Sequence, residues 1–136
     1  MQTIDTLYII DDDETYQFIA KRTIEQTTLV NTIKVFSTGL EAITFLKSAI
    51  DQPELLPEII LLDLTMPVMD GWGFLENYLL LKPRVGKTIY IYIVSSSINP
   101  SDVIKARNIS EVTDYVVKPV TKEKFIELLK SIGQQL

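Results

Sequence analysis

The chain contains 136 residues, of which 46% are apolar and 23% charged, and its net charge is −5. This length suits one domain with a substantial hydrophobic core, and the composition excludes intrinsic disorder. The absence of cysteine and histidine excludes disulfides, thiolate or histidine metal sites, catalytic triads and phosphohistidine carriers. Any bound metal must therefore be a hard cation held by oxygen ligands. An acidic chain without a basic stripe also argues against nucleic acid as a partner.

Membrane and secretory segments are not expected from the sequence. The longest unbroken apolar run, Ile89–Val94, has six residues, whereas a membrane-spanning helix needs about twenty. The first residues also lack the basic head of a secretory signal. We therefore expect a soluble, cytoplasmic protein that has no membrane partner.

Five short apolar runs alternate with longer amphipathic stretches, and we expect each run to form a strand. In chain order the runs are Leu7–Ile10, Ile33–Phe36, Ile59–Leu62, Ile89–Val94 and Tyr115–Val117. The first, third and fourth runs are apolar on both faces, as in strands that helices cover on both sides. Alternation of strand and helix repeated five times predicts an α/β fold with a doubly wound parallel sheet.

The stretches between the runs carry helix signals. Residues of the types that cap helix N-termini stand at Asp13, Thr38, Asn99 and Thr121. Apolar residues recur at helical spacing over residues 42–49 and again over 125–132. Met66-Pro67 and Asp70-Gly71 indicate a turn after the third run. Between residues 107 and 112 the fourth helix must end without a glycine, so its boundary is the least defined.

Chemically active side chains follow the apolar runs, at the strand ends where such sheets bind ligands. In chain order they are Asp11, Asp12, Asp13 and Glu14 after the first run, Asp63 after the third, Ser95, Ser96 and Ser97 after the fourth, and Lys118 after the fifth. The second run is followed only by Ser37 and Thr38. We therefore expect acids, hydroxyls and one lysine to meet at a single edge of the sheet.

Three carboxylates at one edge of the sheet repel one another, so their negative charge must be balanced. Two carboxylates about 5 Å apart repel by roughly 3 kcal/mol at an effective dielectric of 20. Asp11, Asp12 and Asp63 must therefore share a proton, stay apart or bind a cation, and their oxygens suit Mg²⁺. Together with Mg²⁺ and the Lys118 ammonium their formal charges cancel, and an acyl phosphate on one carboxylate adds about one negative charge. Such a site can accept a phosphoryl group.

These segments together resemble the receiver domain of response regulators, and in particular its chemotaxis-type, stand-alone members. The likeness rests on the acidic pair after Tyr8-Ile9-Ile10, the run from Leu61 to Gly71 (LLDLTMPVMDG), the Ser95 hydroxyl, and Tyr115-Val116-Val117-Lys118-Pro119. It extends over essentially the whole chain, in order and with similar spacing. The resemblance implies a flavodoxin-like (βα)5 sheet with strand order 2-1-3-4-5. It also implies a single receiver domain over residues 1–136 without an effector domain.

The resemblance further implies a phosphoacceptor function in a two-component or phosphorelay system. Asp63 matches the acceptor, which takes a phosphoryl group from a phosphohistidine of a sensor histidine kinase or a histidine phosphotransfer protein. Asp11 and Asp12 match the acidic pair that holds Mg²⁺, together with Asp63 and the backbone carbonyl of Thr65. Lys118 matches the lysine that contacts the phosphoryl oxygens. Such a domain catalyses its own phosphorylation and slow dephosphorylation, and it is not expected to turn over an external substrate.

Signal output is implied by two further matches. Ser95 matches a hydroxyl that swings toward the phosphoryl group, and Tyr115 matches a switch aromatic that turns inward with it. The Lys118-Pro119 bond is cis in the family. A downstream target protein is then expected to bind the fourth helix, fifth strand and fifth helix around Tyr115. Residues 109–114 depart from the usual alanine- and glycine-rich turn, so the loop before the fifth strand is expected to differ.

Two other functions remain open. Residues 11–15 also fit the opening motif of haloacid-dehalogenase-type phosphatases, in which Asp11 is the nucleophile and Asp13 the general acid. That family needs a further acidic pair at a strand end after the lysine, and only Glu123 and Glu127 follow, both within an amphipathic stretch. A pseudo-receiver, which binds partners without phosphorylation, is the second alternative. Each residue alone has an ordinary structural explanation, and only the joint pattern is specific.

Overall fold

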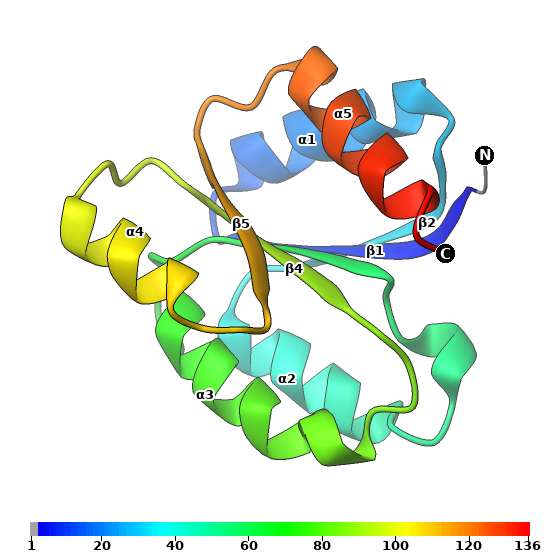
Figure 1. Ribbon diagram of the computed structural model, residues 1–136, viewed down its shortest axis with the longest axis vertical. Coiled ribbons are helices and arrows are strands. Elements are labelled where there is room, and N and C mark those ends of the chain that lie inside the picture. Colours follow the sequence, from blue (N-terminus) through cyan, green and yellow to red (C-terminus); the bar gives the residue numbers. More distant parts are fainter. Residues whose placement is uncertain (1–2) are drawn as a thin grey trace.

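The computed structural model describes residues 3–136 as a five-stranded parallel sheet between two layers of helices (Figure 1). The strands are β1 (Ile4–Ile10), β2 (Val30–Phe36), β3 (Ile59–Leu62), β4 (Tyr90–Ser95) and β5 (Val112–Val117). They lie side by side in the order β2-β1-β3-β4-β5, and all neighbouring pairs are parallel. The predicted flavodoxin-like sheet and its strand order are confirmed.

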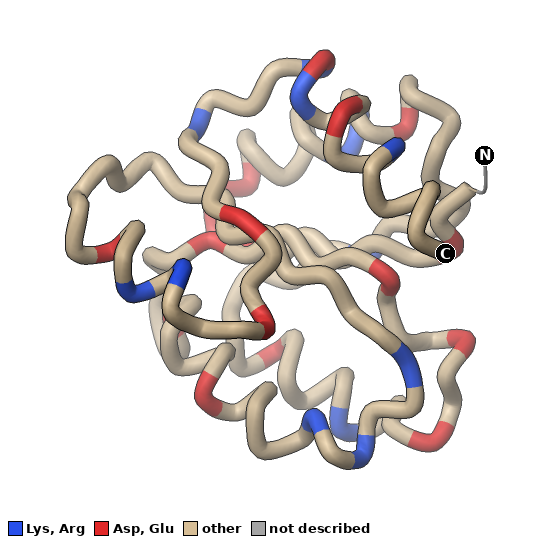
Figure 2. The backbone as a smooth tube through the Cα atoms, viewed as in Figure 1, with Lys and Arg blue, Asp and Glu red and all other residues tan. Residues whose placement is uncertain are grey.

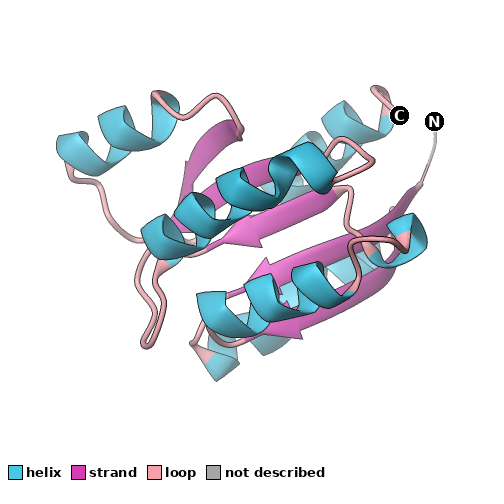
Figure 3. Cartoon of the chain, turned by 90° about the horizontal axis from the view of Figure 1, so that it is seen from below, coloured by secondary structure: helices cyan, strands magenta, loops and turns pink. Residues whose placement is uncertain are grey.

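One helix follows each strand. The helices are α1 (Glu14–Thr27), α2 (Gly39–Ser48), α3 (Gly71–Leu81), α4 (Pro100–Arg107) and α5 (Lys122–Gly133), with short 3-10 turns η1 (Pro53–Leu55) and η2 (Lys82–Arg84). Helices α1 and α5 cover one face of the sheet, and α2 and α3 cover the other, which is the nearer face in Figure 3. Across the residues that the structure describes, no helix combines the length and the apolar character needed to cross a membrane.

The predicted helix caps are confirmed. The side chains of Asp13, Thr38, Asn99 and Thr121 each accept a hydrogen bond from a backbone N–H in the first turn of the helix that follows. Such bonds satisfy amide groups that have no partner within the helix. Helix α4 ends at Arg107 without a glycine, because the N–H of Asn108 donates to the carbonyl of Ile104.

The hydrophobic core lies on both faces of the central strands. Ile10 and Leu62 face the layer of α2 and α3, and Ile9 and Leu61 face the layer of α1 and α5. All four side chains are at most 2% exposed. Successive residues of a strand point to opposite faces, so a strand buried on both faces must be apolar throughout. This rigid central sheet fixes the positions of the residues at its carboxyl edge.

Three strands begin earlier than predicted. The sequence placed the starts of β1, β2 and β5 at Leu7, Ile33 and Tyr115, and each strand begins three residues sooner. In β1 the additional residues include exposed Asp5, whose carboxylate accepts a hydrogen bond of 3.0 Å from Asn31 on β2. The early parts of β2 and β5 likewise contain exposed polar residues, because these two strands form the edges of the sheet. Such segments do not form apolar runs and were therefore missed.

Candidate functional site

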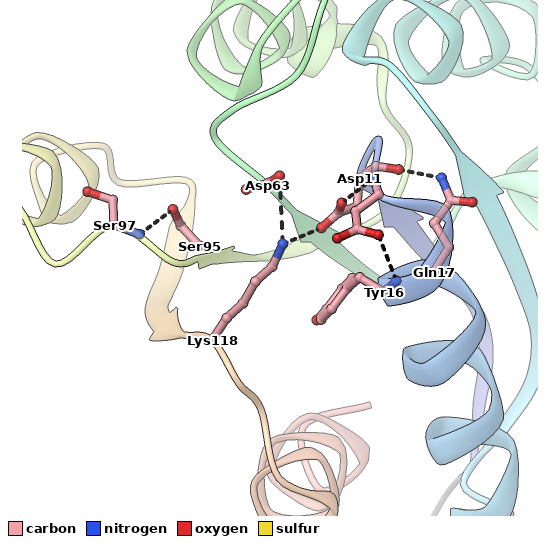
Figure 4. Close-up of polar contacts among 8 residues, drawn as sticks. Asp11, Tyr16, Gln17, Asp63, Ser95, Ser97 and Lys118 are labelled. Carbon is pink, nitrogen blue, oxygen red and sulfur yellow. Dashed lines mark hydrogen bonds and ion pairs between the residues drawn. The ribbon is translucent and has the colours of Figure 1, made fainter.

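The parallel sheet brings the predicted site residues to one edge. Ile10 pairs with Leu62, so the residues that follow, Asp11 and Asp63, leave neighbouring strands at the same level. Ser95 ends β4 and Lys118 follows β5, which pairs with β4. Figure 4 shows these side chains around one small space, and Figure 2 shows acidic positions of separate chain segments close together near the strand ends.

Three carboxylates lie close enough to share a cation. Asp11, Asp12 and Asp63 each offer an oxygen atom, and these oxygens lie within 4.8 Å of one another. Asp11 is 2% and Asp63 8% exposed, whereas Asp12 is open to water. Ligands that are all hard oxygen donors, close together and partly hydrated fit Mg²⁺, which keeps several of its waters. The donor set therefore fits the predicted metal.

Lys118 supplies the single positive charge within this cluster. Its Nζ lies 2.7 Å from Asp11 Oδ2 and 3.7 Å from Asp63 Oδ2, so the ammonium sits nearer to Asp11. The backbone N–H of Lys118 donates to the carbonyl of Ser95 at 2.9 Å, which fixes the start of this loop against β4. The Lys118-Pro119 peptide bond is cis, as the family resemblance predicted.

The environment of Asp63 disfavours its charge. Burial, followed by the negative charge of Asp11, raises the pKa of Asp63 to about 6, against the opposing effects of Lys118 and of the backbone amides of Thr65 and Leu64. A carboxylate that is desolvated beside another carboxylate is destabilised in its ionised form. A cation bound between the two would relieve this repulsion.

The loop after β3 packs closely against the backbone of Asp63. The N–H of Gly71 donates to the carbonyl of Leu64 at 3.0 Å. A Cβ atom at Gly71 would lie 2.5 Å from the Asp63 carbonyl oxygen, so only glycine fits here. Asp70 caps α3 by accepting the N–H of Gly73. Thr65 is an exposed residue of this loop, and its role as a metal ligand stays a prediction.

Ser95 and Tyr115 meet through a residue that the sequence analysis did not single out for a role. The Ser95 hydroxyl is buried and accepts the N–H of Ser97 at 3.1 Å, and the Tyr115 hydroxyl donates to the Ser97 carbonyl at 2.8 Å. The Ser97 hydroxyl donates to Asp102 of α4 at 2.7 Å. Tyr115 is buried, with its ring turned inward toward this loop. Ser97 thus connects β4, β5 and α4.

Two residues of the first turn of α1, Tyr16 and Gln17, also belong to the site, although neither was predicted from the sequence. The Gln17 amide donates to the backbone carbonyl of Asp11 and, at 3.1 Å, to the Ser37 hydroxyl. The ring of Tyr16 lies against the Lys118 ammonium, which is 4.2 Å from the ring centroid. The only signal in the sequence was their position directly after the helix cap, because a first turn that follows a site strand must lie beside the site.

The further acidic pair that the phosphatase alternative needs does not lie at this edge of the sheet. Asp13, the general acid in that alternative, is the cap of α1 and accepts the N–H of Tyr16 at 3.1 Å. Glu123 and Glu127 lie on exposed positions of α5 rather than at a strand end. This arrangement also leaves Asp63 without a function in that alternative.

Comparison with known proteins identifies the family of the chain and agrees with its fold. The family pattern of the response regulator receiver domain matches residues 7–130. The chain is 28% identical over 121 residues to "Sensor histidine kinase CheAY" of Helicobacter pylori, which covers 89% of this chain and 14% of that protein. It is 26% identical over 127 residues to "Probable C4-dicarboxylate response regulator DctR" of Priestia megaterium, covering 92% of this chain and 50% of that protein. Both relatives are therefore much longer than the segment that is matched.

A solved structure agrees over nearly the full length. A two component response regulator from Cytophaga hutchinsonii is 29% identical and superposes with a TM-score of 0.83, covering 96% of this chain and 98% of that one. The two chains therefore share the same overall fold.

Proposed function

The chain belongs to the response regulator receiver domain family of two-component systems, and from this premise we propose that it accepts a phosphoryl group on Asp63. The observation that carries the proposal is the convergence of Asp63 with Asp11, Asp12 and Lys118 at one edge of the sheet. Three carboxylates around one ammonium leave an excess of negative charge, which a divalent cation balances. A phosphoryl group can then join the site at little electrostatic cost.

The reaction is an in-line displacement. A carboxylate oxygen of Asp63 forms a bond to phosphorus as the bond from phosphorus to a histidine nitrogen of the partner breaks, and that nitrogen keeps the electron pair. The partner is a sensor histidine kinase or a histidine phosphotransfer protein. Such a transfer depends on positioning and charge neutralisation rather than on covalent help. Lys118 neutralises charge on the phosphoryl oxygens from its place beside Asp63.

Mg²⁺ would be held by Asp11, Asp12 and Asp63 and by the backbone carbonyl of Thr65. When bound, the ion supplies a positive charge that polarises the phosphoryl oxygens and offsets the carboxylates. The chain itself orients Asp63 through the buried end of β3 and through the close contact of Gly71 with its backbone.

The loop between β4 and α4 transmits the effect of phosphorylation to the surface that binds a target protein. When the Ser95 hydroxyl turns toward a phosphoryl group on Asp63, its bond with Ser97 is lost, and the Tyr115 contact with Ser97 changes with it. Two conformations therefore exist, and phosphorylation shifts their populations. A downstream target protein binds the face of α4, β5 and α5 around Tyr115. The cytoplasmic location expected from the sequence is part of this proposal.

The test is incubation with Mg²⁺ and acetyl phosphate, read by intact mass. We expect one phosphoryl group to be gained by the wild type and none by Asp63→Asn. Asp13→Asn is the matched control, since Asp13 is a neighbouring carboxylate that caps α1, and it should gain the group as the wild type does. Label that survives in Asp63→Asn but is lost in Asp11→Asn would support the phosphatase alternative. A folded wild type that gains no label would support the pseudo-receiver.

A further inference from the structure

The ammonium of Lys118 has a neighbour that carries no charge. Its Nζ lies 4.2 Å from the centroid of the Tyr16 ring, in addition to its contacts with Asp11 and Asp63 (Figure 4). We propose that Tyr16 is a positioning residue, whose ring face holds the Lys118 ammonium between the two carboxylates. The proposal deepens the proposed function, because it concerns how the lysine reaches the phosphoryl group.

The Lys118 ammonium needs a group that fixes its position, because its two carboxylate contacts are unequal. Nζ is 2.7 Å from Asp11 and 3.7 Å from Asp63, so attraction to Asp11 draws it away from the phosphoryl acceptor. A lysine ammonium is a point charge on a flexible stem, which does not fix its own position. The side chain is also 18% exposed, so water competes for the ammonium.

An aromatic ring meets this need without adding negative charge. The face of a ring attracts a cation through its quadrupole. A further carboxylate in this place would compete with the phosphoryl group for the lysine, in a site that already holds three. The ring also excludes water from one side of the ammonium, which strengthens its remaining electrostatic contacts.

The position of the ring is fixed by the helix that carries it. The backbone N–H of Tyr16 donates to the side chain of Asp13, the cap of α1, at 3.1 Å. The ring also packs against the core between α1, α5 and the sheet. Its anchor is therefore the helix start and the core, and does not depend on Lys118.

The face of the Tyr16 ring, and not its hydroxyl, interacts with the Lys118 ammonium. Among residues 3–136 the Tyr16 hydroxyl is the buried side-chain oxygen or nitrogen that lacks a hydrogen-bond partner. In Figure 4 the hydroxyl end of the ring points away from Asp11 and Asp63. Burial, and then the charges of Asp11 and Asp63, raise the pKa of Tyr16, so the ring stays neutral rather than becoming a phenolate. Phenylalanine should therefore serve as well as tyrosine.

The first experiment compares Tyr16→Leu with Tyr16→Phe for uptake of phosphoryl groups from acetyl phosphate at saturating Mg²⁺. We expect Tyr16→Leu to lower the maximal rate about three- to tenfold, the range for loss of a partly buried cation–π contact. The dissociation constant for Mg²⁺, measured by calorimetry, should stay within about twofold because Tyr16 offers the metal no ligand. Tyr16→Phe should rescue the rate. Phe18→Leu makes the same kind of change at an exposed position of α1 and should match the wild type.

The second experiment needs no phosphorylation. Metal-free protein is treated briefly with acetic anhydride, and acetylation of each lysine is measured by peptide mass, with exposed Lys82 as the internal reference. Lys118 should react about three- to tenfold faster in Tyr16→Leu than in Tyr16→Phe, since the ring no longer covers and attracts the ammonium. If Tyr16→Leu does not fold, Tyr16→Met replaces it, because methionine is flexible and has no ring.

The outcomes separate this proposal from the proposed function. A wild type that gains no phosphoryl group overturns the proposed function, while the acetylation of Lys118 still decides the role of the ring. Equal acetylation and equal uptake in Tyr16→Leu and Tyr16→Phe would overturn the positioning role, because a ring that matters cannot be replaced by leucine. Equal impairment of both variants would also overturn it, since the hydroxyl would then be the active group.

Discussion

Replacing Asp63 with asparagine should stabilise the metal-free protein. Asp63 is 8% exposed, and burial together with Asp11 raises its pKa from 3.8 to about 6. A raised pKa means that the folded state binds the proton more tightly than the unfolded state does. The ionised carboxylate therefore opposes folding at neutral pH, and Asp63→Asn removes that charge while keeping nearly the same shape. Lys118 keeps its closer partner, Asp11, at 2.7 Å.

The expected gain in the free energy of unfolding follows from the pKa shift of Asp63. A change of about two pKa units corresponds to about 3 kcal/mol, and exchange with water at the edge of the sheet reduces this to about 1–2 kcal/mol. The carboxyl's contribution to stability is fully present below pH 3.8 and is lost as the pH rises through about 6. The advantage of Asp63→Asn should therefore be complete at pH 7.5 and about half as large at pH 5. In a domain of this size it raises Tm by about 3–10 °C.

The assay is urea denaturation in EDTA at pH 7.5 and pH 5, with thermal melts alongside. Asp12→Asn is the control, because Asp12 is exposed and its removal should change the free energy of unfolding by less than about 0.5 kcal/mol. Excess Mg²⁺ should reduce or reverse the greater stability of Asp63→Asn. The wild type keeps all the metal ligands, so Mg²⁺ binding stabilises it more than the variant. A variant that is less stable than the wild type at pH 7.5, or an advantage that does not shrink at pH 5, would refute the reasoning.

Three other substitutions test the neighbouring structure. Gly71→Ala places a Cβ 2.5 Å from the Asp63 carbonyl oxygen. It should therefore lower the free energy of unfolding, measured in urea, by about 2–4 kcal/mol. Gly86→Ala is the control and should have little effect, because the space around Gly86 is open. Val68 has a φ of 70° and is 80% exposed, so Val68→Gly should raise Tm by relieving about 1 kcal/mol of backbone strain, and a lower Tm would contradict this. Lys118→Met leaves buried Asp11 without its cation and should lower the free energy of unfolding by about 1–3 kcal/mol at pH 7.5 in urea. A Lys118→Met variant as stable as the wild type would contradict a stabilising role for this ion pair.

The sheet could be predicted because burial on both faces requires continuous apolar runs. β3 was predicted to the residue and β4 to within one residue at each end, since every residue of β3 and nearly every residue of β4 is buried. The starts of β1, β2 and β5 were missed because polar residues such as Asp5 and Asn31 stand in them. Those residues are strand-forming only because a neighbouring strand pairs with them, and a local pattern does not contain that information.

The grouping of the candidate site was predictable for a geometric reason. Residues directly after parallel strands must lie at one edge, so Asp11, Asp63 and Lys118 were expected to meet, and they do. Tyr16 and Gln17 were not predicted, nor was the connecting role of Ser97, because the direction of a side chain in a helical turn or loop depends on the path of the backbone. The roles of Thr65, Ser95 and Tyr115 rest on the family resemblance and stay predictions.

The same few hydrogen bonds connect the acidic cluster with the proposed output face. The backbone N–H of Lys118 donates to the carbonyl of Ser95, while the Ser95 side chain accepts the N–H of Ser97. Ser97 in turn bonds Tyr115 of β5 and Asp102 of α4. Under the proposed function, a phosphoryl group that draws the Ser95 hydroxyl toward Asp63 would therefore break a bond to the same Ser97 that contacts β5 and α4. Because these bonds share Ser97, we expect them to rearrange together, so that coupling between Asp63 and the proposed output face would involve two discrete conformations.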